Sequence, residues 1–283
     1  MHIITISRGS FSYGKEIAEK VAETLGYECI SREILFEASR FFNVSERKLL
    51  QSLHDAPTFL EKVFRGKQQY IAYIRVALLE HVKQDNVVYH GHAGHLLIPE
   101  IKHVLKVRIL ADMDERVALV KQRQKLSTDE AVAYVRDLDK HRFKWTRYLY
   151  NVDIEDPSLY DIIINISGMR IEDACAIICS AARCETFETT PEDKRALNDL
   201  ALQGHVSTAI QTLCKADVVA RDGVVHIKVP AQKLKKTSYS SPQTQLQVQE
   251  TIQIDLTKKI TEIVSKIPDV KYVTCDIHRP YYA

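Results

Sequence analysis

The chain has 283 residues, enough for one large domain or two modest ones with proper cores. Its net charge of +2 and charged fraction of 27% give no general case for binding nucleic acid or an acidic membrane surface. No apolar run approaches the roughly 20 residues of a spanning helix, no signal-peptide layout is present, and the cysteines form no C-x-x-C pair, so we expect a reduced, cytoplasmic protein.

The N-terminal residues predict a strand, a glycine-bearing loop and a helix. Residues 3–6 are an apolar run of the kind that a buried parallel strand needs. Residues 7–14 form the loop, and the helix opens at Lys15 with apolar residues on one face. A helix start offers unpaired N–H groups and a positive dipole end, which favour a polyphosphate.

The stretch from Gly9 to Glu16 reads G-x-x-x-x-G-K-E, close to the P-loop pattern. Glu16 stands where the pattern asks for the hydroxyl that reaches Mg²⁺. The alternative is a strand-to-helix turn whose glycines only ease the turn. We predict phosphate binding, with these residues: Gly9, Ser10, Phe11, Ser12, Tyr13, Gly14, Lys15 and Glu16.

Strands and helices alternate along the following residues. The predicted strands are 27–30, 86–90, 104–110 and 160–166, and the predicted helices are 32–42, a helical insertion over 57–83, 114–125, 128–149 and 171–182. Ser127 and Glu130 form a capping box before the long helix. This alternation predicts a parallel sheet with helices on both faces.

The composition changes after residue 184, where a polar, proline-ended linker is predicted. A helix to about Lys215, a hairpin turning at Asp222-Gly223, a helix over 252–264 and a strand over 269–277 follow. Residues 231–249 are predicted as a long exposed insertion. The expected domains are 1–184, a linker and helix start at 185–196, and an αββαβ module at 197–283.

The first 183 residues resemble the cytidylate kinase-like family of P-loop nucleoside-monophosphate kinases. The resemblance lies in ITISRGS…YGKEIAEKVAETLGY, NVVYHGHAGHLL, LKVRILA and DKHRFKWTRYLYNVDIEDPSLYDIIINIS, in that order. The segments RDGVVHIKV and VSKIPDVKYVTCDI resemble a BON module. The resemblance implies an α/β P-loop domain with a helical lid, followed by a small α+β domain.

The family resemblance implies ATP- and Mg²⁺-dependent phosphoryl transfer to CMP or dCMP. Lys15 and the loop amides would hold the donor phosphates, and lid arginines would cover the transferring group. Candidates are Arg123, and Arg142 with Asp139, which is three residues away on the same helix face and could aim the guanidinium. The alternative for each is a solvated helix face.

Two departures from the family pattern fall in the implied acceptor pocket. Ser31-Arg32 stands where relatives show an acidic then a basic residue, and Gly91-His92 stands where they show Gly-Arg. Ser31 could act only as a helix cap, and a histidine is mostly neutral at pH 7. The predicted acceptor residues are therefore Ser31, Arg32, Gly91 and His92.

The departures also support a second hypothesis: a nucleotide-binding regulator with weak or lost catalysis, signalling through the C-terminal module. The histidines of H-x-H-x-x-H at 90, 92 and 95 could converge on a metal ion at the end of the strand. We interpret them instead as a polar ligand-side loop, and we predict no metal site there. Expected partners are nucleotides, with dimerisation or small-ligand binding as hypotheses for the C-terminal module, and neither nucleic acid nor a membrane span.

Overall fold

The computed structural model describes residues 2–31, 34, 38–40, 45, 64–91, 94–98, 101–234 and 241–282. The chain divides into two compact units, Met1–Lys194 and Arg195–Ala283. This division lies inside the stretch 185–196 that the sequence suggested as a linker, while the domain limits given above stay a prediction.

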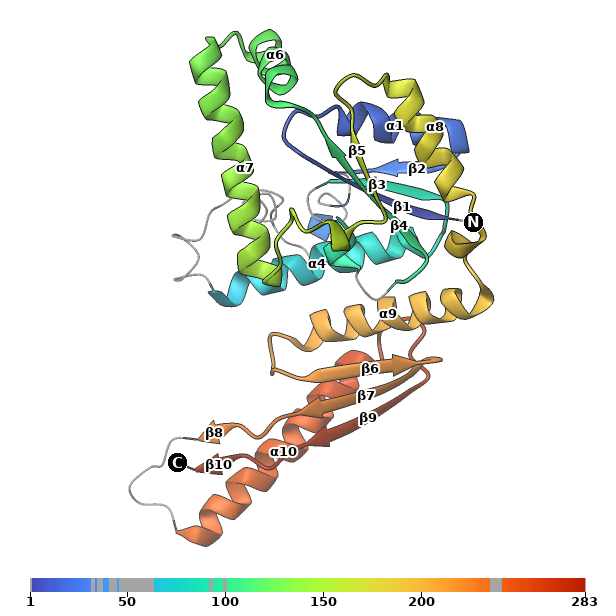
Figure 1. The fold of residues 1–283 in the computed structure, drawn as a ribbon. Coiled ribbons are helices and arrows are strands. Elements are labelled where there is room, and N and C mark those ends of the chain that lie inside the picture. Colours follow the sequence, from blue (N-terminus) through green and yellow to red (C-terminus); the bar gives the residue numbers. More distant parts are fainter. Residues whose placement is uncertain are drawn as a thin grey trace. The chain divides into compact units, whose positions relative to one another are not determined.

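The first unit is built on a five-stranded parallel sheet of order β2-β3-β1-β4-β5 (Figure 1). The central strand β1 pairs with β3 from Ile3 opposite Val87, and with β4 from Ile3 opposite Val104. The register brings the carboxyl ends of the strands to one edge, where parallel sheets bind ligands. The strands are β1 Ile3–Arg8, β2 Glu28–Ile30, β3 Val87–His90, β4 Val104–Leu110 and β5 Ile162–Asn165.

Helices cover both faces of this sheet, which confirms the predicted fold class. Helices α1 (Gly14–Leu25) and α8 (Ile171–Ala182) lie on one face and α4 (Phe64–Val82) on the other (Figure 1). Three short helices, α5 (Gly94–Leu97), η2 (Pro157–Leu159) and η3 (Glu185–Phe187), lie in the described connections. Each strand of a parallel sheet is buried on both faces, so the strands are nearly continuous apolar runs.

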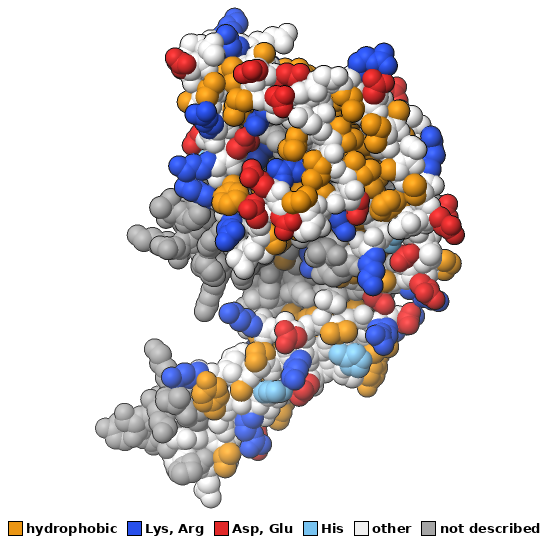
Figure 2. Space-filling model, in the orientation of Figure 1, with side chains coloured by type: hydrophobic (Ala, Val, Ile, Leu, Met, Phe, Trp, Pro, Cys, Tyr) orange, Lys and Arg blue, Asp and Glu red, His pale blue; other side chains and the backbone are white. Residues whose placement is uncertain are grey.

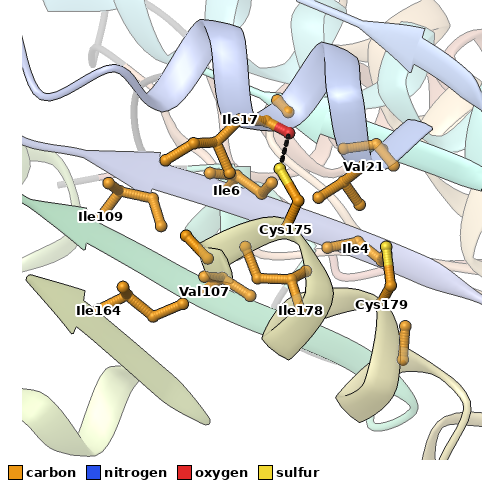
Figure 3. Packing of buried hydrophobic residues seen from close by; sticks show 14 of the residues in the cluster. Ile4, Ile6, Ile17, Val21, Val107, Ile109, Ile164, Cys175, Ile178 and Cys179 are labelled. Carbon is orange, nitrogen blue, oxygen red and sulfur yellow. Dashed lines mark hydrogen bonds between the residues drawn. The ribbon is translucent and has the colours of Figure 1, made fainter. Parts of the chain in front are cut away.

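The core between the sheet and helices α1 and α8 is aliphatic (Figure 3). Cys175 and Cys179 lie within it, and the Cys175 thiol donates to the Ile17 carbonyl at 3.7 Å. Burial raises the pKa of Cys175 to about 11, so this thiol stays protonated at neutral pH. Both cysteines are therefore packing residues, as their shared helix face predicts.

Two adjacent isoleucines of α8 offer a test of this packing. Ile178 is fully buried and Ile177 is 42% exposed. We expect Ile178→Ala to lower the free energy of unfolding by about 2–5 kcal/mol, because it removes buried methyl groups and leaves a cavity. Ile177→Ala should change it by about 0.5 kcal/mol or less. Urea unfolding of both variants checks this, and equal losses would contradict the described orientation of α8.

A helical hairpin follows β4. Helix α6 (Met113–Gln124) and helix α7 (Thr128–Tyr150) pack through a small cluster of their own that contains Val117, Val120, Ala131 and Val135. The predicted capping box is present: Ser127 accepts from the Glu130 backbone, and the Glu130 side chain accepts from the Ser127 backbone. We call α6 and α7 the lid hairpin.

The helices and the three-stranded sheet of the second unit follow the predicted αββαβ order, to which two further short strands are added. Helix α9 (Pro191–Ile210) ends five residues before the predicted Lys215, and the hairpin of β6 (Asp217–Arg221) and β7 (Val224–Val229) turns at Asp222-Gly223. Strand β9 (Tyr272–Ile277) pairs in parallel with β7. Gly223 has φ +84° and a Cβ there would lie 2.8 Å from the Asp269 carbonyl, so this turn requires glycine. The BON resemblance of this unit stays a prediction.

The exposed insertion predicted over 231–249 is wrong in part. Helix α10 (Pro242–Val264) begins ten residues before the predicted Ile252, and residues 233–234 form β8, which pairs with β10 (Tyr281–Tyr282). Ser241 caps the helix by accepting from the Thr244 backbone at 3.2 Å. The Gln249 amide, from the stretch predicted as an exposed insertion, donates to the Pro280 carbonyl, and the Gln253 amide donates to the Ile277 carbonyl, so both glutamines hold the C-terminal segment beside the helix.

Among the described residues, the helices are too short or too polar to cross a bilayer. On the face drawn in Figure 2, basic and acidic side chains are interspersed rather than gathered by sign. This mixture agrees with the formal net charge of +2.

Candidate functional site

The predicted phosphate-binding loop lies between the end of β1 and the start of α1. Phe11 and Tyr13 have left-handed backbone conformations, with φ of 57° and 56°. Tyr13 precedes the helix and its side chain makes no capping hydrogen bond. The first turn of α1 therefore begins without the side-chain cap that usually satisfies one of its N–H groups, as suits a turn that receives an anion.

Strand β4 holds the first half of this loop. The Gly9 N–H donates to the Ile109 carbonyl at 3.0 Å, and the Ser12 hydroxyl lies 3.2 Å from the same carbonyl and 3.1 Å from the Gly9 carbonyl. Ser10 and Ser12 are both 1% exposed. The Ser12 hydroxyl therefore holds the shape of the loop from inside, and Ser10 is buried beside it.

Gly14 is required by the side chain of Arg8. A Cβ at Gly14 would lie 2.7 Å from the Cβ and from the Cδ of Arg8, well inside contact distance. The Arg8 guanidinium continues to His90, with Nη1 3.4 Å from Nδ1. Arg8 thus crosses from the phosphate loop to the end of β3.

Arg142 of the lid hairpin reaches the same place. Its Nη1 donates to the Arg8 carbonyl at 3.1 Å. Burial, followed by the nearby Arg8 and Arg116 guanidiniums, lowers the pKa of Arg142 to about 10, while Asp139 opposes the shift. Arg142 is still charged at pH 7, so like charges are held close together beside the loop.

Asp139 pairs with a different arginine from the one that the sequence suggested. Its Oδ2 lies 2.5 Å from Nη2 of Arg116, and its Oδ1 accepts from the Ser10 N–H at 3.3 Å. Arg116 in turn donates from Nε to the Ser10 carbonyl at 2.6 Å. The contacts of Asp139 therefore position Arg116 and Ser10, and Arg142 is held by the Arg8 backbone instead.

Glu16 and Arg123 join α1 to the end of α6. Arg123 Nη2 lies 2.7 Å from Glu16 Oε1, which places this lid arginine beside the phosphate loop. Burial would raise the pKa of Glu16, but its backbone N–H, Arg123 and Arg8 outweigh burial and lower it. Lys15 contacts Glu19 at 3.5 Å and its side chain is 60% exposed, so it can turn toward a ligand.

The pKa of Glu16 sets the pH range of this ion pair. Since the folded pKa of Glu16 lies below its ordinary value of 4.5, the pair contributes stability that is present above that value and lost as the pH falls through the folded pKa. We expect Glu16→Gln to be less stable than wild type at pH 7 and equal to it once the folded pKa is passed. Thermal melts across pH 2–7 measure this, and a difference that persists at the lowest pH would contradict it.

Of the four predicted acceptor residues, the structure describes Ser31 and Gly91. Ser31 follows β2 and Gly91 follows β3, and Ile30 pairs with Tyr89, so both lie at the ligand edge. Arg32 and His92 lie outside the described residues. Gly91 packs on the Tyr89 ring, where a Cβ would lie 2.6 Å from the hydroxyl. Burial raises the pKa of Tyr89 to about 12 against the opposing charge of Arg8, so its hydroxyl is a neutral group.

The two described histidines of the H-x-H-x-x-H segment have separate partners. His90 contacts Arg8, while His95 Nδ1 lies 3.0 Å from the Ser7 hydroxyl. Burial, then Lys106 and Arg108, lower the pKa of His95 to about 4, so it is neutral at pH 7. Its ring packs against the Tyr160 ring in a tilted arrangement, with the two centroids 4.8 Å apart. His95 is therefore a packed residue on the sheet face opposite α1.

Sequence reasoning missed Arg8 and Arg116 as site residues. Arg8 sits at the carboxyl end of the central strand, directly before the loop, and that position was a usable signal. Arg116 lies in the first turn of α6, where it looked like one of several surface charges. Its side chain is 11% exposed, and only the packing of α6 against the loop reveals it.

The fold and the site together define the class: a P-loop α/β protein with an arginine-bearing lid hairpin. The chain belongs to the cytidylate kinase-like family, whose pattern it matches over residues 3–168.

Relatives in that family include the cytidylate kinase of Sulfolobus acidocaldarius, 34% identical over 96 residues, which are 34% of this chain and 52% of that protein. This chain thus spans about half the length of that relative. The cytidylate kinase of Pyrococcus horikoshii is 26% identical over 182 residues, covering 63% of this chain and 87% of that protein. An uncharacterized protein from Eubacterium ventriosum has a similar structure, with a TM-score of 0.51 at 19% identity over 64% of this chain and 98% of that one. This last likeness shows the fold alone.

Proposed function

We propose that this protein transfers the γ-phosphoryl group of ATP to a nucleoside monophosphate, with CMP or dCMP as the first candidates. The observation that carries this proposal is the set of guanidiniums around the loop. Arg142 donates to the Arg8 carbonyl, the Arg8 guanidinium reaches His90, and Arg116 donates to the Ser10 carbonyl, so three cations surround the loop where a polyphosphate would be neutralised. Membership in a kinase-like family supports a phosphotransferase.

Lys15 and the first turn of α1 are the proposed binding groups for the donor phosphates. The Lys15 ammonium is exposed beside the loop, and the helix start adds its dipole. Mg²⁺, which the family implies, suits the Glu16 carboxylate, a hard oxygen ligand that is ionised at neutral pH. Bound there, Mg²⁺ would neutralise phosphate charge.

Transfer requires an acceptor phosphate oxygen to attack the γ-phosphorus while the bond to the β–γ bridging oxygen breaks. ADP leaves with that electron pair, and a nucleoside diphosphate forms. Arg142 and Arg8 lie between the loop and the end of β3, and we assign them to the charge that spreads over the transferring group. Arg123 would leave its ion pair with Glu16 and bind phosphate oxygens instead. Asp139 is assigned to positioning.

The acceptor side is proposed at the ends of β2 and β3, with Ser31, Arg32, Gly91 and His92. Arg8 enters this side as well, through its contact with His90 at 3.4 Å. An arginine from the donor side would partly replace the arginine that relatives show in the position of His92.

The second candidate, a nucleotide-binding regulator, is favoured by the pairing of Glu16 with Arg123. This contact occupies both a proposed Mg²⁺ ligand and a proposed transfer residue. A protein held in this state would bind a nucleotide and transfer slowly.

A steady-state assay separates the two candidates. The full chain is supplied with ATP and Mg²⁺ and a panel of CMP, dCMP, UMP and AMP, with ADP formation followed and Lys15→Ala as the control. Turnover above about 1 s⁻¹ with a pyrimidine monophosphate supports the kinase. ATP binding in calorimetry without turnover on the whole panel supports the regulator, and absence of ATP binding overturns both.

A further inference from the structure

The P-loop places an aromatic side chain against the lid hairpin. Phe11 packs against the small cluster between α6 and α7, and its ring lies 5.9 Å from that of Tyr134. The backbone of Phe11 has φ 57°, a conformation that side-chain-bearing residues seldom adopt. The apolar contact with the lid hairpin therefore accompanies an unusual shape of the phosphate loop itself.

The preceding residue is held by the same two helices. The Ser10 N–H donates to Asp139 of α7, and the Ser10 carbonyl accepts from Arg116 of α6. Arg116 and Asp139 close the ring at 2.5 Å, and the Arg116 side chain is 11% exposed. A guanidinium can make these two contacts at once because its donors form a planar fork.

We propose that Arg116 is a positioning residue which, with Phe11, makes the P-loop and the lid hairpin one mechanical unit. Two consecutive loop residues contact both lid helices, one through polar groups and one through an apolar ring. We therefore expect a ligand that orders the loop to order α6 and α7 as well, together with the lid arginines Arg123 and Arg142 that these helices carry. The nature of the ligand, ATP, rests on the proposed function, whereas the coupling itself does not.

Hydrogen exchange of the full ligand-free chain tests the coupling directly. We expect Arg116→Ala to speed amide exchange by about tenfold both in the loop, residues 9–14, and in α7 around Asp139. Arg116→Lys should give an intermediate effect, because an ammonium lacks the fork. Lys140→Ala removes an exposed charge next to Asp139 and serves as the matched control, with no change expected in the loop. Faster exchange confined to α6, with the loop unchanged, would overturn the proposal.

A second set of measurements keeps the result independent of a folding defect. Phe11→Leu retains an apolar side chain and should loosen the loop less than Phe11→Ala, while circular dichroism confirms that each variant is folded. Adding ethylguanidine to Arg116→Ala should restore protection of the loop, which a general loss of packing would not allow. Failure of this rescue, with both variants folded, counts against Arg116 as a positioning residue.

Hydrogen exchange in the presence of ATP then tests whether binding at the loop also orders α7. In wild type, ATP should slow exchange in the loop and in α7 together; in Arg116→Ala it should still slow exchange at the start of α1 but no longer in α7. If ATP protects the loop alone in wild type, the coupling is wrong. If ATP has no effect on wild type, the proposed function fails, and the ligand-free comparison still decides the coupling.

Discussion

Replacing Lys15 by alanine is expected to weaken ATP binding by about 10–100-fold, the range that a charge-assisted hydrogen bond of about 1.5–3 kcal/mol contributes. Transfer should slow further, by about 10²–10³, if the ammonium follows the charge that develops on the phosphates. The side chain is 60% exposed and contacts only Glu19 among the ion pairs described for it, so the fold should be unaffected. Calorimetry with ATP and Mg²⁺ measures the binding, and a thermal melt measures the stability.

Lys20 provides the matched control for this substitution. It lies five residues further along α1 and pairs with Glu172 of α8, away from the loop. Lys20→Ala removes the same charge from the same helix and should leave ATP affinity unchanged within a factor of about two. If the two variants bind ATP equally well, the loop does not use Lys15 and the phosphate site lies elsewhere.

Gly14→Ala is expected to lower both stability and ATP affinity. The added methyl would lie 2.7 Å from two carbon atoms of Arg8, so either the loop or the Arg8 side chain must move. Overpacking of this kind costs about 1–3 kcal/mol. Because Arg8 also contacts His90, a displaced Arg8 should weaken the acceptor side as well. Urea unfolding and titration with ATP and then with CMP measure the two losses.

Gly9→Ala tests whether the loss comes from contact with Arg8 or from any methyl group in the loop. A Cβ at Gly9 has no neighbour closer than 3.7 Å, the distance to the Ser12 hydroxyl. Its effect on the free energy of unfolding should be about 0.5 kcal/mol or less. Equal destabilisation by both substitutions would show that Arg8 does not lie over Gly14.

Much of the architecture could be predicted because the local sequence patterns point to the same elements that a parallel sheet with flanking helices requires. The strand at 104–110, the helix at 171–182 and the capping box at Ser127 and Glu130 all match the structure. The long helix that starts at 128 ends at Tyr150, one residue from the prediction. Apolar periodicity and capping residues are local signals, so they remain readable without tertiary contacts.

Helix α10 shows where local signals mislead. Its first turns carry Gln and Thr, and polar composition suggested an exposed loop. The Gln249 and Gln253 amides donate to the carbonyls of Pro280 and Ile277, which lie 31 and 24 residues further along the chain. Such a partner is invisible to periodicity, and tertiary contacts override the local preference.

The sequence by itself determined the parts of the candidate site that are contiguous in the chain. The order of strand, glycine-bearing loop, Lys15 and helix needs only neighbouring residues, because a helix start and its dipole are local properties. The family resemblance likewise followed from segments in their order along the chain, and the match over residues 3–168 bears it out.

Only the tertiary structure decided which charges meet. Asp139 and Arg142 share a helix face, yet the carboxylate pairs with Arg116, 23 residues earlier, and Arg142 reaches the Arg8 carbonyl, 134 residues earlier. Helix spacing can show which side chains are close on one helix, but not which surface that face meets. The packing of α6 and α7 against the loop makes that choice, because it buries Arg116 where Ser10 and Asp139 are its available partners.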